Sequence, residues 1–385
     1  MEETTYVANN LISVFRCIAD PRVERSKVYP LIEVIFLTVC GVISGCDSWD
    51  EIADFGEEKL EWLRKYLPYK NGTPSHDSIN RTMSLIDPKA LEKSFIDWAT
   101  TGIQLPKGYA IQIDGKSLRG SASKSLQQVP HIKGGKSARH ILHAYAGELK
   151  ICIGQVQVES KGNEITAIPA LLDLLDVNGA VITIDAIGCQ KAITEQIISK
   201  KADYIIAVKE NQEKLLNGII EAFDKVDVEK TEVNSCRTED KAHSREEIRW
   251  CTVLPSSELS VEIQESWVGL KMIVRVDSER KCKGKAESEM SHRYFIASMV
   301  ETPQTMLKNI RGHWSIENSL HWVLYVGFRE DMSKKEARNA AANYSAILKV
   351  AMNLLQKVEE KKVSMARKRK KCRGSDQYRE KCLGF

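Results

Sequence analysis

The sequence predicts an α/β protein in which helices cover a mixed sheet, an all-helical domain comes first, and a β-rich subdomain is inserted late in the chain. Three observations support this prediction. Apolar residues recur at helical spacing in the first hundred residues, strands and helices alternate strictly over residues 164–223, and residues 226–293 break that alternation with β-like fragments. With 385 residues, 43% of them hydrophobic, the chain can bury a sizeable core and is expected to form two or three structural units.

The composition is that of an ordinary soluble protein. Ten cysteines are scattered from Cys17 to Cys382 without a C-x-x-C pair, which argues against a disulfide framework or a zinc knuckle. No secretory leader is evident, and the longest apolar run, residues 34–46, is shorter than the roughly 18 to 20 residues of a membrane span. We therefore expect a cytoplasmic protein with reduced thiols, no membrane partner, and a buried helix at residues 34–46.

Residues 1–105 are predicted to form the helical N-terminal domain. Helical periodicity is clear in "SWDEIADFGEEKLEWLRKYL", residues 48–67, and in "PKALEKSFIDWATTGI", residues 88–103. Between them, "LPYKNGTPSHDS" has the composition of a loop, and His76 and Asp77 near its end are expected to begin another helix. A helix-turn-helix is an alternative for this region.

A second domain is predicted from residue 106 to residue 357. It opens with the β-rich runs "YAIQIDGKSL", "RHILHAYAG" and "KICIGQVQVES". Helices and strands then alternate in "EITAIPALLDLLDV", "AVITIDAI", "CQKAITEQIISKK", "DYIIAVK" and "NQEKLLNGIIEAF". After the insertion at about residues 226–293, the strand "YFIASM" resumes the core, which ends in a long helical region, Gln304–Lys357. This order predicts a mixed sheet covered by helices.

The net charge of +4 is unevenly distributed along the chain. Residues 1–105 hold 16 acidic and 11 basic residues, so the rest of the chain carries the positive excess. Eight basic residues and no acidic one fall between Lys361 and Arg373, in "KKVSMARKRKKCR". Such clustering suits a surface that binds phosphates, and a solvated, disordered tail over residues 358–385 is the alternative.

Three carboxylates stand out by their positions. Asp114 ends the run "YAIQID" just before Gly115, Asp185 ends "AVITID" in the same way, and Glu317 lies in the helical segment "NIRGHWSIENSLHWVL". Ligands of α/β sheets bind outside the strand ends, so two strand-borne aspartates and a helix-borne glutamate could converge on one site. Mg²⁺ takes oxygen ligands of this kind together with waters and substrate phosphates, and paired metal ions suit phosphodiester chemistry.

Each of these acids also has a plainer interpretation. A strand-end aspartate before a helix is commonly an N-cap, and a glutamate within a helix is usually a surface residue. His313, Glu317 and His321 share one helix stripe, which adds zinc as an alternative, although no cysteine or further acid is evident as another ligand. Position alone therefore leaves a cap, a magnesium site and a zinc site open.

Longer motifs resemble a known family. The stretches "IQIDGKSLRGS", "NEITAIPALLDLLDVNGAVITIDAIGCQKAI", "DYIIAVKENQEKL" and "RGHWSIENSLHWVLYVGFRED" are similar to those of bacterial insertion-sequence transposases of the DDE class, in the ISAs-type branch with the H-repeat-associated proteins. The N-terminal "DPRVERSKVYPLIEVIFLTVCGVISGCDSWDEIADFG" and "GTPSHDSINRTMSLID" resemble the helical domain associated with that branch. The resemblance covers nearly the whole chain, in order.

The resemblance implies an RNase H-like catalytic core in which Asp114, Asp185 and Glu317 form the metal-binding triad, with Mg²⁺ as cofactor and Mn²⁺ as a substitute. It implies a transposase of the bacterial cytoplasm, nucleoid-associated when bound to DNA, that binds terminal inverted repeats and catalyses metal-dependent strand cleavage and strand transfer into target DNA. Coupled cutting of two ends implies a homodimer on DNA. The alternatives are a decayed or repurposed DNA-binding protein of the same family, and a related nuclease without strand transfer.

Basic residues near the acids and in the basic run are predicted to contact DNA. Lys116 and Arg119 follow Asp114 closely and could hold a phosphate. The remaining candidates are basic residues beside Glu317 or in the run: Arg311, His313, His321, Arg367, Lys368, Arg369, Lys370 and Lys371. Lys209 and Asn211 match a family motif at a strand-to-helix junction, where helix capping by Asn211 is the simpler interpretation.

The sequence departs from the family at two places. Relatives generally carry an aspartate where this chain has Tyr325, and a motif of the inserted region is present as "HSREE" at residues 243–247. The tryptophans that flank Glu317, Trp314 and Trp322, are expected to pack in the protein interior rather than to stack on bases.

Overall fold

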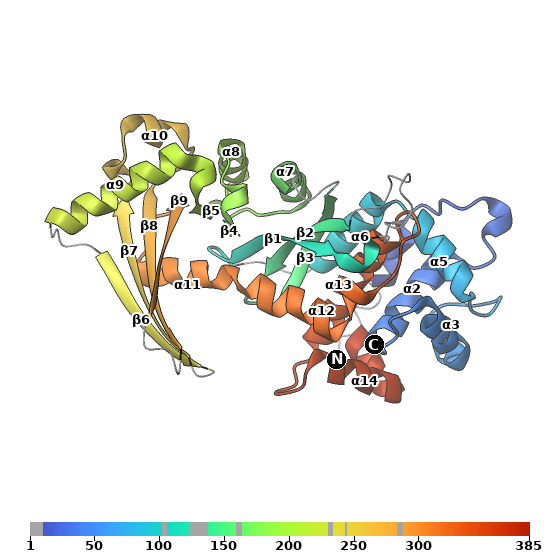
Figure 1. Cartoon of the computed structure of the whole chain (residues 1–385). Coiled ribbons are helices and arrows are strands. Elements are labelled where there is room, and N and C mark those ends of the chain that lie inside the picture. Colours follow the sequence, from blue (N-terminus) through green and yellow to red (C-terminus); the bar gives the residue numbers. More distant parts are fainter. Residues whose placement is uncertain are drawn as a thin grey trace, which may run out of the picture. The chain divides into compact units, whose positions relative to one another are not determined.

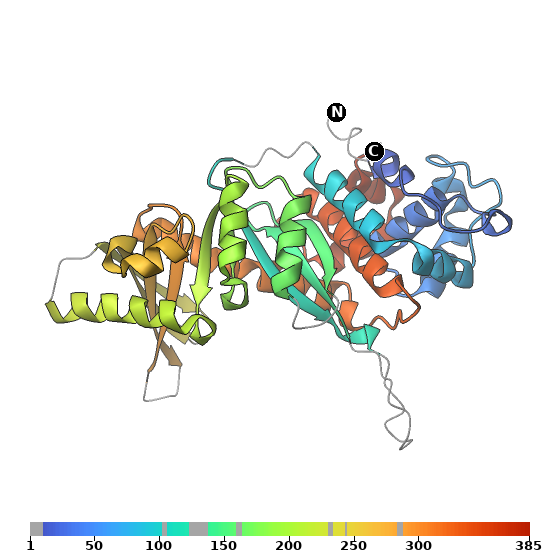
Figure 2. The ribbon, with the colours of Figure 1, turned by 90° about the horizontal axis from the view of Figure 1, so that it is seen from above.

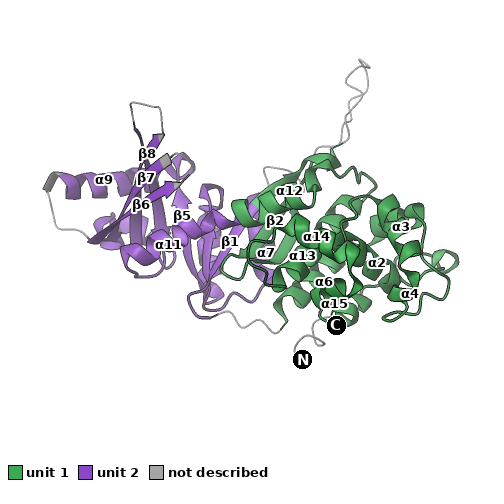
Figure 3. Ribbon diagram, turned by 90° about the horizontal axis from the view of Figure 1, so that it is seen from below, with its two compact units in different colours: residues 1–104, 115–163, 317–385 green, residues 105–114, 164–316 purple. Residues whose placement is uncertain are grey.

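A computed structural model describes residues 11–101, 106–122, 138–158, 164–229, 234–242, 245–282 and 288–385 (Figure 1). The chain forms two compact units, each built from segments that are not contiguous in sequence (Figure 3). Unit 1 comprises Met1–Gln104, Gly115–Asn163 and Glu317–Phe385, and unit 2 comprises Leu105–Asp114 and Glu164–Ile316. The N-terminal helical region therefore shares a unit with the C-terminal helices and with two strands.

Unit 1 is built around one long buried helix, α13 (Ala340–Lys357), which contacts α2 (Leu31–Ile43), α5 (His76–Leu85) and α6 (Pro88–Thr100). Two antiparallel strands, β2 and β3, pair with each other, and β3 lies against α6 and α13. The other strands and helices of the unit with at least four residues are β2 (Arg139–Ala146), β3 (Ile151–Val158), α3 (Trp49–Glu58), α4 (Leu60–Leu63), α12 (Trp322–Gly327), α14 (Met365–Gly374) and α15 (Asp376–Leu383).

Local sequence explains where several of these helices begin. Ser48 and Glu51 form a capping box at the start of α3, and Asp87 caps α6 just before Pro88 at its first position. The segment Glu24–Ile43 is apolar and long enough to cross a membrane, but 72% of its 18-residue apolar window is buried inside the protein, as in a core helix. This confirms the predicted buried helix.

Unit 2 contains the larger part of the sheet, in the strand order β1-β4-β5-β9-β8-β7-β6. β1, β4 and β5 are parallel, whereas β5, β9, β8, β7 and β6 pair antiparallel. The bounds of the strands are β1 (Ala110–Leu118), β4 (Val181–Ile184), β5 (Asp203–Val208), β6 (Asn234–Ala242), β7 (Arg245–Pro255), β8 (Met272–Cys282) and β9 (Glu289–Ala297). The C-terminal half of β1 belongs to unit 1, where the order is β3-β2-β1.

Helices cover both faces of this sheet (Figures 1 and 2). On one face lie α7 (Glu164–Leu174) and α8 (Lys191–Ser199), and on the other lies α11 (Pro303–His313), which contacts β4, β6 and β7. Further along the chain are α9 (Glu213–Glu229) and α10 (Val261–Ser266). An apolar cluster joins the sheet to α11; it includes Val181, Ile205, Cys251, Val253, Val274, Met306, Leu307 and Ile310.

The structure confirms the mixed α/β architecture and refines two predictions. The inserted strands are not separate from the core sheet, because β9 begins at Glu289 and pairs with both β5 and β8. The long helical region Gln304–Lys357 is interrupted by a π-helix at Ile316–His321 and by η7 (Glu330–Met332). The basic run is also folded, since it forms α14.

Candidate functional site

Asp114 and Asp185 lie on neighbouring parallel strands, directly after the last paired residues, although β1 continues past Asp114 to Leu118 whereas β4 ends at Ile184. β1 and β4 pair in a register that matches Ile113 with Ile184, and each aspartate is the next residue. Neighbouring strands are about 4.8 Å apart, and residues two apart along a strand face the same side. Both carboxylates therefore belong to the sheet face that carries Gln112 and Thr183. The register brings the two acids onto neighbouring positions of one face, and their role as a site stays a prediction; the expectation that Asp114 ends its strand was wrong.

Asp185 also acts as a cap. Its Oδ1 accepts a hydrogen bond of 3.1 Å from the backbone N–H of Ile187, at the start of the 3₁₀-helix Ala186–Gly188. Desolvation by the surrounding protein raises the pKa of Asp185, and Glu164 raises it further, while Lys209 opposes both. The residue nevertheless remains exposed. The capping interpretation is thus confirmed, and it leaves the carboxylate open to a ligand.

The loop after Asp185 is held in place by the next strand-end loop. Asn211 Nδ2 donates to the carbonyl of Ala186 at 2.8 Å, and Gln212 Nε2 donates to the carbonyl of Cys189 at 2.8 Å. A Cβ atom at Gly188 would lie 2.4 Å from Ile184 Cγ2, so only glycine fits there. Asn211 is therefore a bridge between loops, and the prediction that it caps a helix was wrong.

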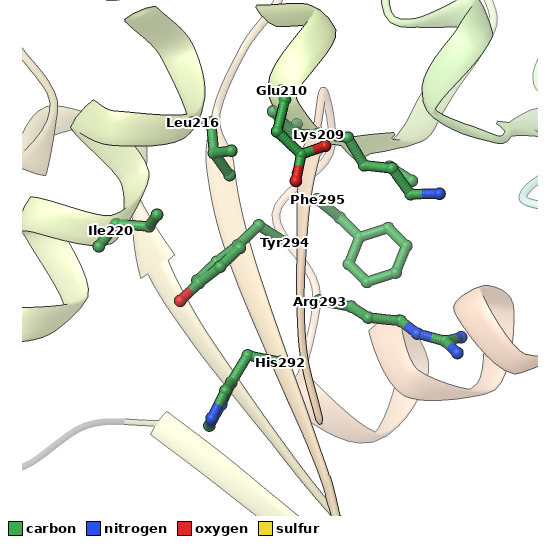
Figure 4. A pocket seen from close by; sticks show the side chains of 10 residues that line it. Lys209, Glu210, Leu216, Ile220, His292, Arg293, Tyr294 and Phe295 are labelled. Carbon is green, nitrogen blue, oxygen red and sulfur yellow. The ribbon is translucent and has the colours of Figure 1, made fainter. Parts of the chain in front are cut away.

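A pocket of about 320 Å³ lies beside the end of β5, within unit 2 (Figure 4). Lys209 and Glu210 line it from the strand end, and His292, Arg293 and Tyr294 line it from β9. Its wall combines positive charge with aromatic surface. These are the properties of a surface that accommodates a phosphate or a base.

Helix α11 packs on the face of the sheet that carries the aspartates. His313 Nδ1 is 3.0 Å from Thr183 Oγ1, two residues before Asp185, and a Cβ atom on Gly312 would lie 4.0 Å from Gln112 Nε2. Burial lowers the pKa of His313 to about 4, so the ring is neutral at pH 7. His313 is half-buried and bonded to Thr183, and its predicted contact with DNA stays a prediction.

Glu317 lies in the π-helix Ile316–His321 and is exposed. π-helical segments are rare and often occur at functional sites. The neighbouring tryptophans are 43% (Trp314) and 59% (Trp322) exposed, and Tyr325 is 52% exposed. The expectation that both tryptophans pack in the interior was therefore wrong. Exposed aromatic rings of this size commonly mark interaction surfaces.

Within the described part of the chain, no group of three or more His, Cys, Asp or Glu side chains is arranged to hold a metal ion. The convergence of Glu317 with the two aspartates therefore stays a prediction. The zinc alternative has no geometric support in these ranges, because His313 bonds to Thr183 and His321 Nε2 lies 3.2 Å from His143 Nδ1.

His321 is turned into unit 1. Burial lowers its pKa to about 3, and the Lys116 ammonium lowers it further. His143, its partner, is fully buried, and burial also holds the pKa of His143 well below its ordinary value. His321 itself is half-buried, and its predicted contact with DNA stays a prediction.

Lys116 is used inside the protein. Its Nζ donates to Glu330 Oε2 at 2.7 Å and to Asp331 Oδ1 at 3.1 Å, and its side chain is 12% exposed. Glu330 also accepts a hydrogen bond from Lys349 at 2.7 Å. Burial alone would raise the pKa of Glu330, but the ammonium groups of Lys349 and Lys116 lower it to about 2. The predicted phosphate contact by Lys116 is thus replaced by a buried ion-pair cluster.

Sequence reasoning missed Glu330, Asp331 and Lys349. The two acids lie in "FRED", a motif that was visible, but nothing local marks them as partners of a lysine more than 200 positions earlier. Arg119, in contrast, is exposed in the 3₁₀-helix Arg119–Ser121 and stays a candidate DNA contact.

The basic run divides into buried and exposed residues. Lys368 donates to the carbonyls of Leu355 and Val358, and Arg369 donates to backbone carbonyls and to Asp47 Oδ1 at 2.6 Å. Both are 5% exposed, so neither can reach DNA in this conformation, which corrects two further predicted contacts. Arg367 and Lys370 are exposed. Lys371 pairs with Glu360 at 2.8 Å and is 38% exposed.

The remaining predicted contact, Arg311, is 44% exposed and pairs with Asp240 at 2.8 Å. The inserted "HSREE" motif is only partly visible, because His243 and Ser244 lie outside the described residues. Its last residue, Glu247, pairs with Arg249 at 2.7 Å. The first pair joins α11 to β6, and the second lies within β7.

Family models match most of the chain. The "Transposase DDE domain" model matches residues 106–354, and the "DDE_Tnp_1-associated" model matches residues 12–99. "Putative transposase YncI" of Escherichia coli O157:H7 is 41% identical, over 97% of this chain and 94% of its own length. "H repeat-associated putative transposase YhhI" of Escherichia coli K12 is 37% identical, over 92% of each chain. A solved piggyBac transposase synaptic complex with hairpin DNA aligns with 96% of this chain and 79% of that chain, at 12% identity and a TM-score of 0.42.

Proposed function

The chain belongs to the DDE transposase family, and we propose that it cuts DNA at the terminal inverted repeats of an insertion sequence and joins the freed ends to target DNA. Asp114, Asp185 and Glu317 are the proposed catalytic acids. The observation that supports this best is the register of β1 and β4, in which the two acids follow the last pair of matched residues, Ile113 and Ile184, on neighbouring parallel strands.

The donor set suits a hard divalent cation, with Mg²⁺ as the proposed cofactor and Mn²⁺ as its substitute. Asp114 and Asp185 offer neighbouring carboxylate oxygens, and desolvation of Asp185 is a cost that a bound cation would offset. Glu317 is the proposed third ligand. Bound there, Mg²⁺ supplies electrostatic stabilisation of the charge that develops on phosphodiester oxygens.

The protein's own contribution is positioning. In the proposed reaction, water breaks one P–O bond at the end of the element and frees a 3′-hydroxyl, whose oxygen then attacks a target phosphodiester while one P–O bond of the target breaks. No covalent enzyme intermediate is required, so no serine or tyrosine nucleophile is proposed. The bridges from Asn211 and Gln212 keep the loop after Asp185 fixed, which lowers the cost of orienting the reacting groups.

Exposed cations are the proposed DNA contacts. Arg119 follows β1, Arg311 lies on α11, and Arg367, Lys370 and Lys371 lie on α14. Phosphate contacts of this kind supply affinity that does not depend on sequence and falls with added salt. Because two ends are joined to one target, the proposed active form is a homodimer on DNA.

The test is cleavage of a labelled terminal-repeat duplex by the Asp185→Asn variant. Asparagine is nearly isosteric and remains a good N-cap, so the bond to Ile187 should survive while the negative charge is lost. We expect no detectable nicking in Mg²⁺ or Mn²⁺ and end binding close to that of the wild type. Asp114→Asn and Glu317→Gln should behave alike, and combined variants should lose no more than single ones.

Asp176→Asn is the matched control, because Asp176 is an aspartate of unit 2 whose Oδ1 also accepts a backbone N–H two residues on, from Asn178. It should cut like the wild type.

Nicking by Asp185→Asn at the wild-type rate, or nicking by the wild type in EDTA, would refute the metal mechanism. A wild type that binds ends but never cuts would favour the non-catalytic alternative, with Tyr325→Asp as the first change to try. Nicks without joined products would favour the nuclease.

A further inference from the structure

Glu330 is the centre of a buried cluster that the proposed chemistry does not use. Both of its oxygens are occupied: Oε2 accepts from Lys116 at 2.7 Å, and Oε1 accepts from Lys349 at 2.7 Å and from Ser345 Oγ at 3.0 Å. Its side chain is 3% exposed and that of Lys349 is 0% exposed. A carboxylate so enclosed has no room for a phosphate or a solvent cation.

The backbone is distorted to place this carboxylate. Arg329, directly before Glu330, has a φ of 50° and a ψ of 35°, a left-handed conformation that residues other than glycine rarely adopt. Such a conformation persists only where the surroundings enforce it. The strained backbone at Arg329 and the complete pairing of the Glu330 oxygens indicate that the fold maintains the position of this carboxylate.

The cluster is connected to β1 just after Asp114. Lys116 is two residues beyond Asp114 in the same uninterrupted strand, so the side chains of the two residues belong to the same face. A second connection lies at Gly120, where an added Cβ atom would be 2.5 Å from the carbonyl oxygen of Ser333 and 2.8 Å from that of Asp331. The chain after Asp114 therefore contacts residues 330–333 at two places: Lys116 of β1 bonds to Glu330 and Asp331, and Gly120, just beyond β1, packs closely against Asp331 and Ser333.

The free energies typical of buried ion pairs argue against a purely stabilising role for the Glu330 cluster. Replacement of a buried ion pair by apolar residues of similar volume is often neutral or even stabilising, so such a cluster is weak evidence for stability. Lys116, Lys349, Glu330 and Asp331 balance in charge, which also argues against an anion site. A directional network that fixes the strand beside a metal ligand is the role that its geometry suits, since partners behind the ligands commonly set metal affinity.

We propose that Glu330 is a positioning residue, which acts through Lys116 to hold Asp114 in the orientation that binds the divalent metal. This inference rests on the proposed function, in which Asp114 is a ligand. It requires that loosening of the Lys116 contact weakens metal binding more than it weakens folding or DNA binding.

The experiment is a Mn²⁺ titration followed by electron paramagnetic resonance, on the full chain bound to a terminal-repeat duplex. Glu330→Gln removes the charge at the centre, and Lys116→Met removes the bonds from β1 to both Glu330 and Asp331 while the Glu330–Lys349 pair stays. We expect either variant to bind Mn²⁺ at least tenfold more weakly than the wild type, with unchanged gel-shift affinity for the DNA. Cleavage should recover towards the wild-type rate at saturating Mn²⁺.

Asp47→Asn is the matched control. It removes the carboxylate from another ion pair of unit 1, Arg369–Asp47 at 2.6 Å, in which Arg369 is buried, Asp47 is 28% exposed and neither partner is a residue of β1. It should lower the unfolding midpoint without changing the Mn²⁺ affinity. Equal Mn²⁺ affinity in Lys116→Met and wild type would overturn the proposal, as would failure of Lys116→Met to fold, which would assign the contact to stability. A wild type that binds no Mn²⁺ would instead overturn the proposed function itself.

Discussion

Charged residues serve opposite purposes in the two units. In unit 1, Lys349, Arg369 and Arg379 are almost fully buried, and each bonds to several acceptors of the same unit. In unit 2, the ion pairs of the antiparallel strands keep some contact with water: Asp277 and Glu247 are 15% and 13% exposed, and Asp240, the partner of Arg249 and Arg311, is 45% exposed. Among the described residues, every buried Lys, Arg, Asp or Glu therefore belongs to unit 1.

The residue types are the same in both units, and what differs is the free energy that is lost when one charge of a pair is removed. Removal of one member of a buried pair leaves its partner desolvated, which typically costs about 3 to 5 kcal/mol, whereas an exposed pair is worth about 0 to 1 kcal/mol. A basic sequence therefore indicates DNA binding only where its charges reach solvent. The following predictions test the contrast, from the largest expected effect to the smallest.

Arg369→Ala should give the largest loss of stability. It would leave Asp47 and the carbonyls of Val42, Gly327 and Cys46 without their donor. We expect the free energy of unfolding to fall by about 4 kcal/mol, measured by urea denaturation of the full chain. Arg373→Ala, at an exposed position of the same helix, is the control and should change it by less than about 0.5 kcal/mol. Equal losses of unfolding free energy in the two variants would show that buried and exposed arginines of α14 do not differ in their contribution to stability.

Glu92 should make the stability of unit 1 depend on pH. Burial raises the pKa of Glu92 to about 8, and the nearby Asp87 raises it further, against the bond of 3.1 Å from the N–H of Gln157. The unfolded chain has a Glu pKa of about 4.3. Between these values the folded state binds a proton that the unfolded state has lost, so this contribution to stability declines as the pH rises from about 4.3 to about 8.

Glu92→Gln should remove that decline. Relative to the wild type it should gain about 3 kcal/mol between pH 5 and pH 8, measured by urea denaturation at each pH. Glu57→Gln, at an exposed position of α3, should leave the pH profile unchanged. Parallel profiles for wild type and Glu92→Gln would show that Glu92 is not protonated in the folded protein.

The sequence predicts local features of this fold well. The alternating segments foretell β4 and β5, because each is an apolar run bounded by polar residues, and the β-rich run "YAIQIDGKSL" foretells β1. The neighbouring positions of Asp114 and Asp185 also follow from a general rule, because consecutive apolar runs of an α/β core pair as parallel strands, although β1 continues past Asp114. Both inferences need only neighbouring residues and one general rule.

Burial through distant partners could not be predicted. Arg369 and Lys370 are adjacent and chemically alike, but Arg369 meets a carbonyl of Val42, 327 positions away, while Lys370 faces water. Which face of α14 is turned toward the protein decides whether a residue is buried or exposed, and no local sequence pattern marks that face. The bonds of His313 to Thr183 and of His321 to His143, and the exposure of Trp322, likewise have no local signal in the sequence.

Asp240→Asn should have a small effect on stability and a visible one on DNA binding. The loss of an exposed carboxylate beside Arg249 and Arg311 should change the free energy of unfolding by less than about 1 kcal/mol. It should also free Arg311 from its acidic partner and strengthen binding to random duplex DNA at low salt. A gel-shift series in rising salt would check this, and weaker binding at low salt would argue that Asp240 orients Arg311 for DNA.

Arg367→Ala combined with Lys370→Ala should have the smallest effect on stability and the clearest effect on DNA affinity. The two residues are three positions apart, so they share one exposed face of α14. Among the described residues, neither side chain forms an ion pair. Lys368 and Arg369, between them, must be left intact, because their replacement would unfold the segment that presents the charges.

For this double variant we expect an unfolding midpoint equal to that of the wild type and weaker binding to terminal-repeat and random duplexes alike. The slope of log K against log salt should flatten by about 0.9 for each phosphate that the variant no longer neutralises, so by up to about 2. Fluorescence anisotropy at several salt concentrations measures it. A loss confined to the terminal-repeat duplex would mean that α14 reads sequence, and an unchanged slope would mean that its exposed charges face away from DNA. Only the uniform loss with a flatter slope would show that, within one basic run, the exposed residues bind DNA and the buried ones hold the fold.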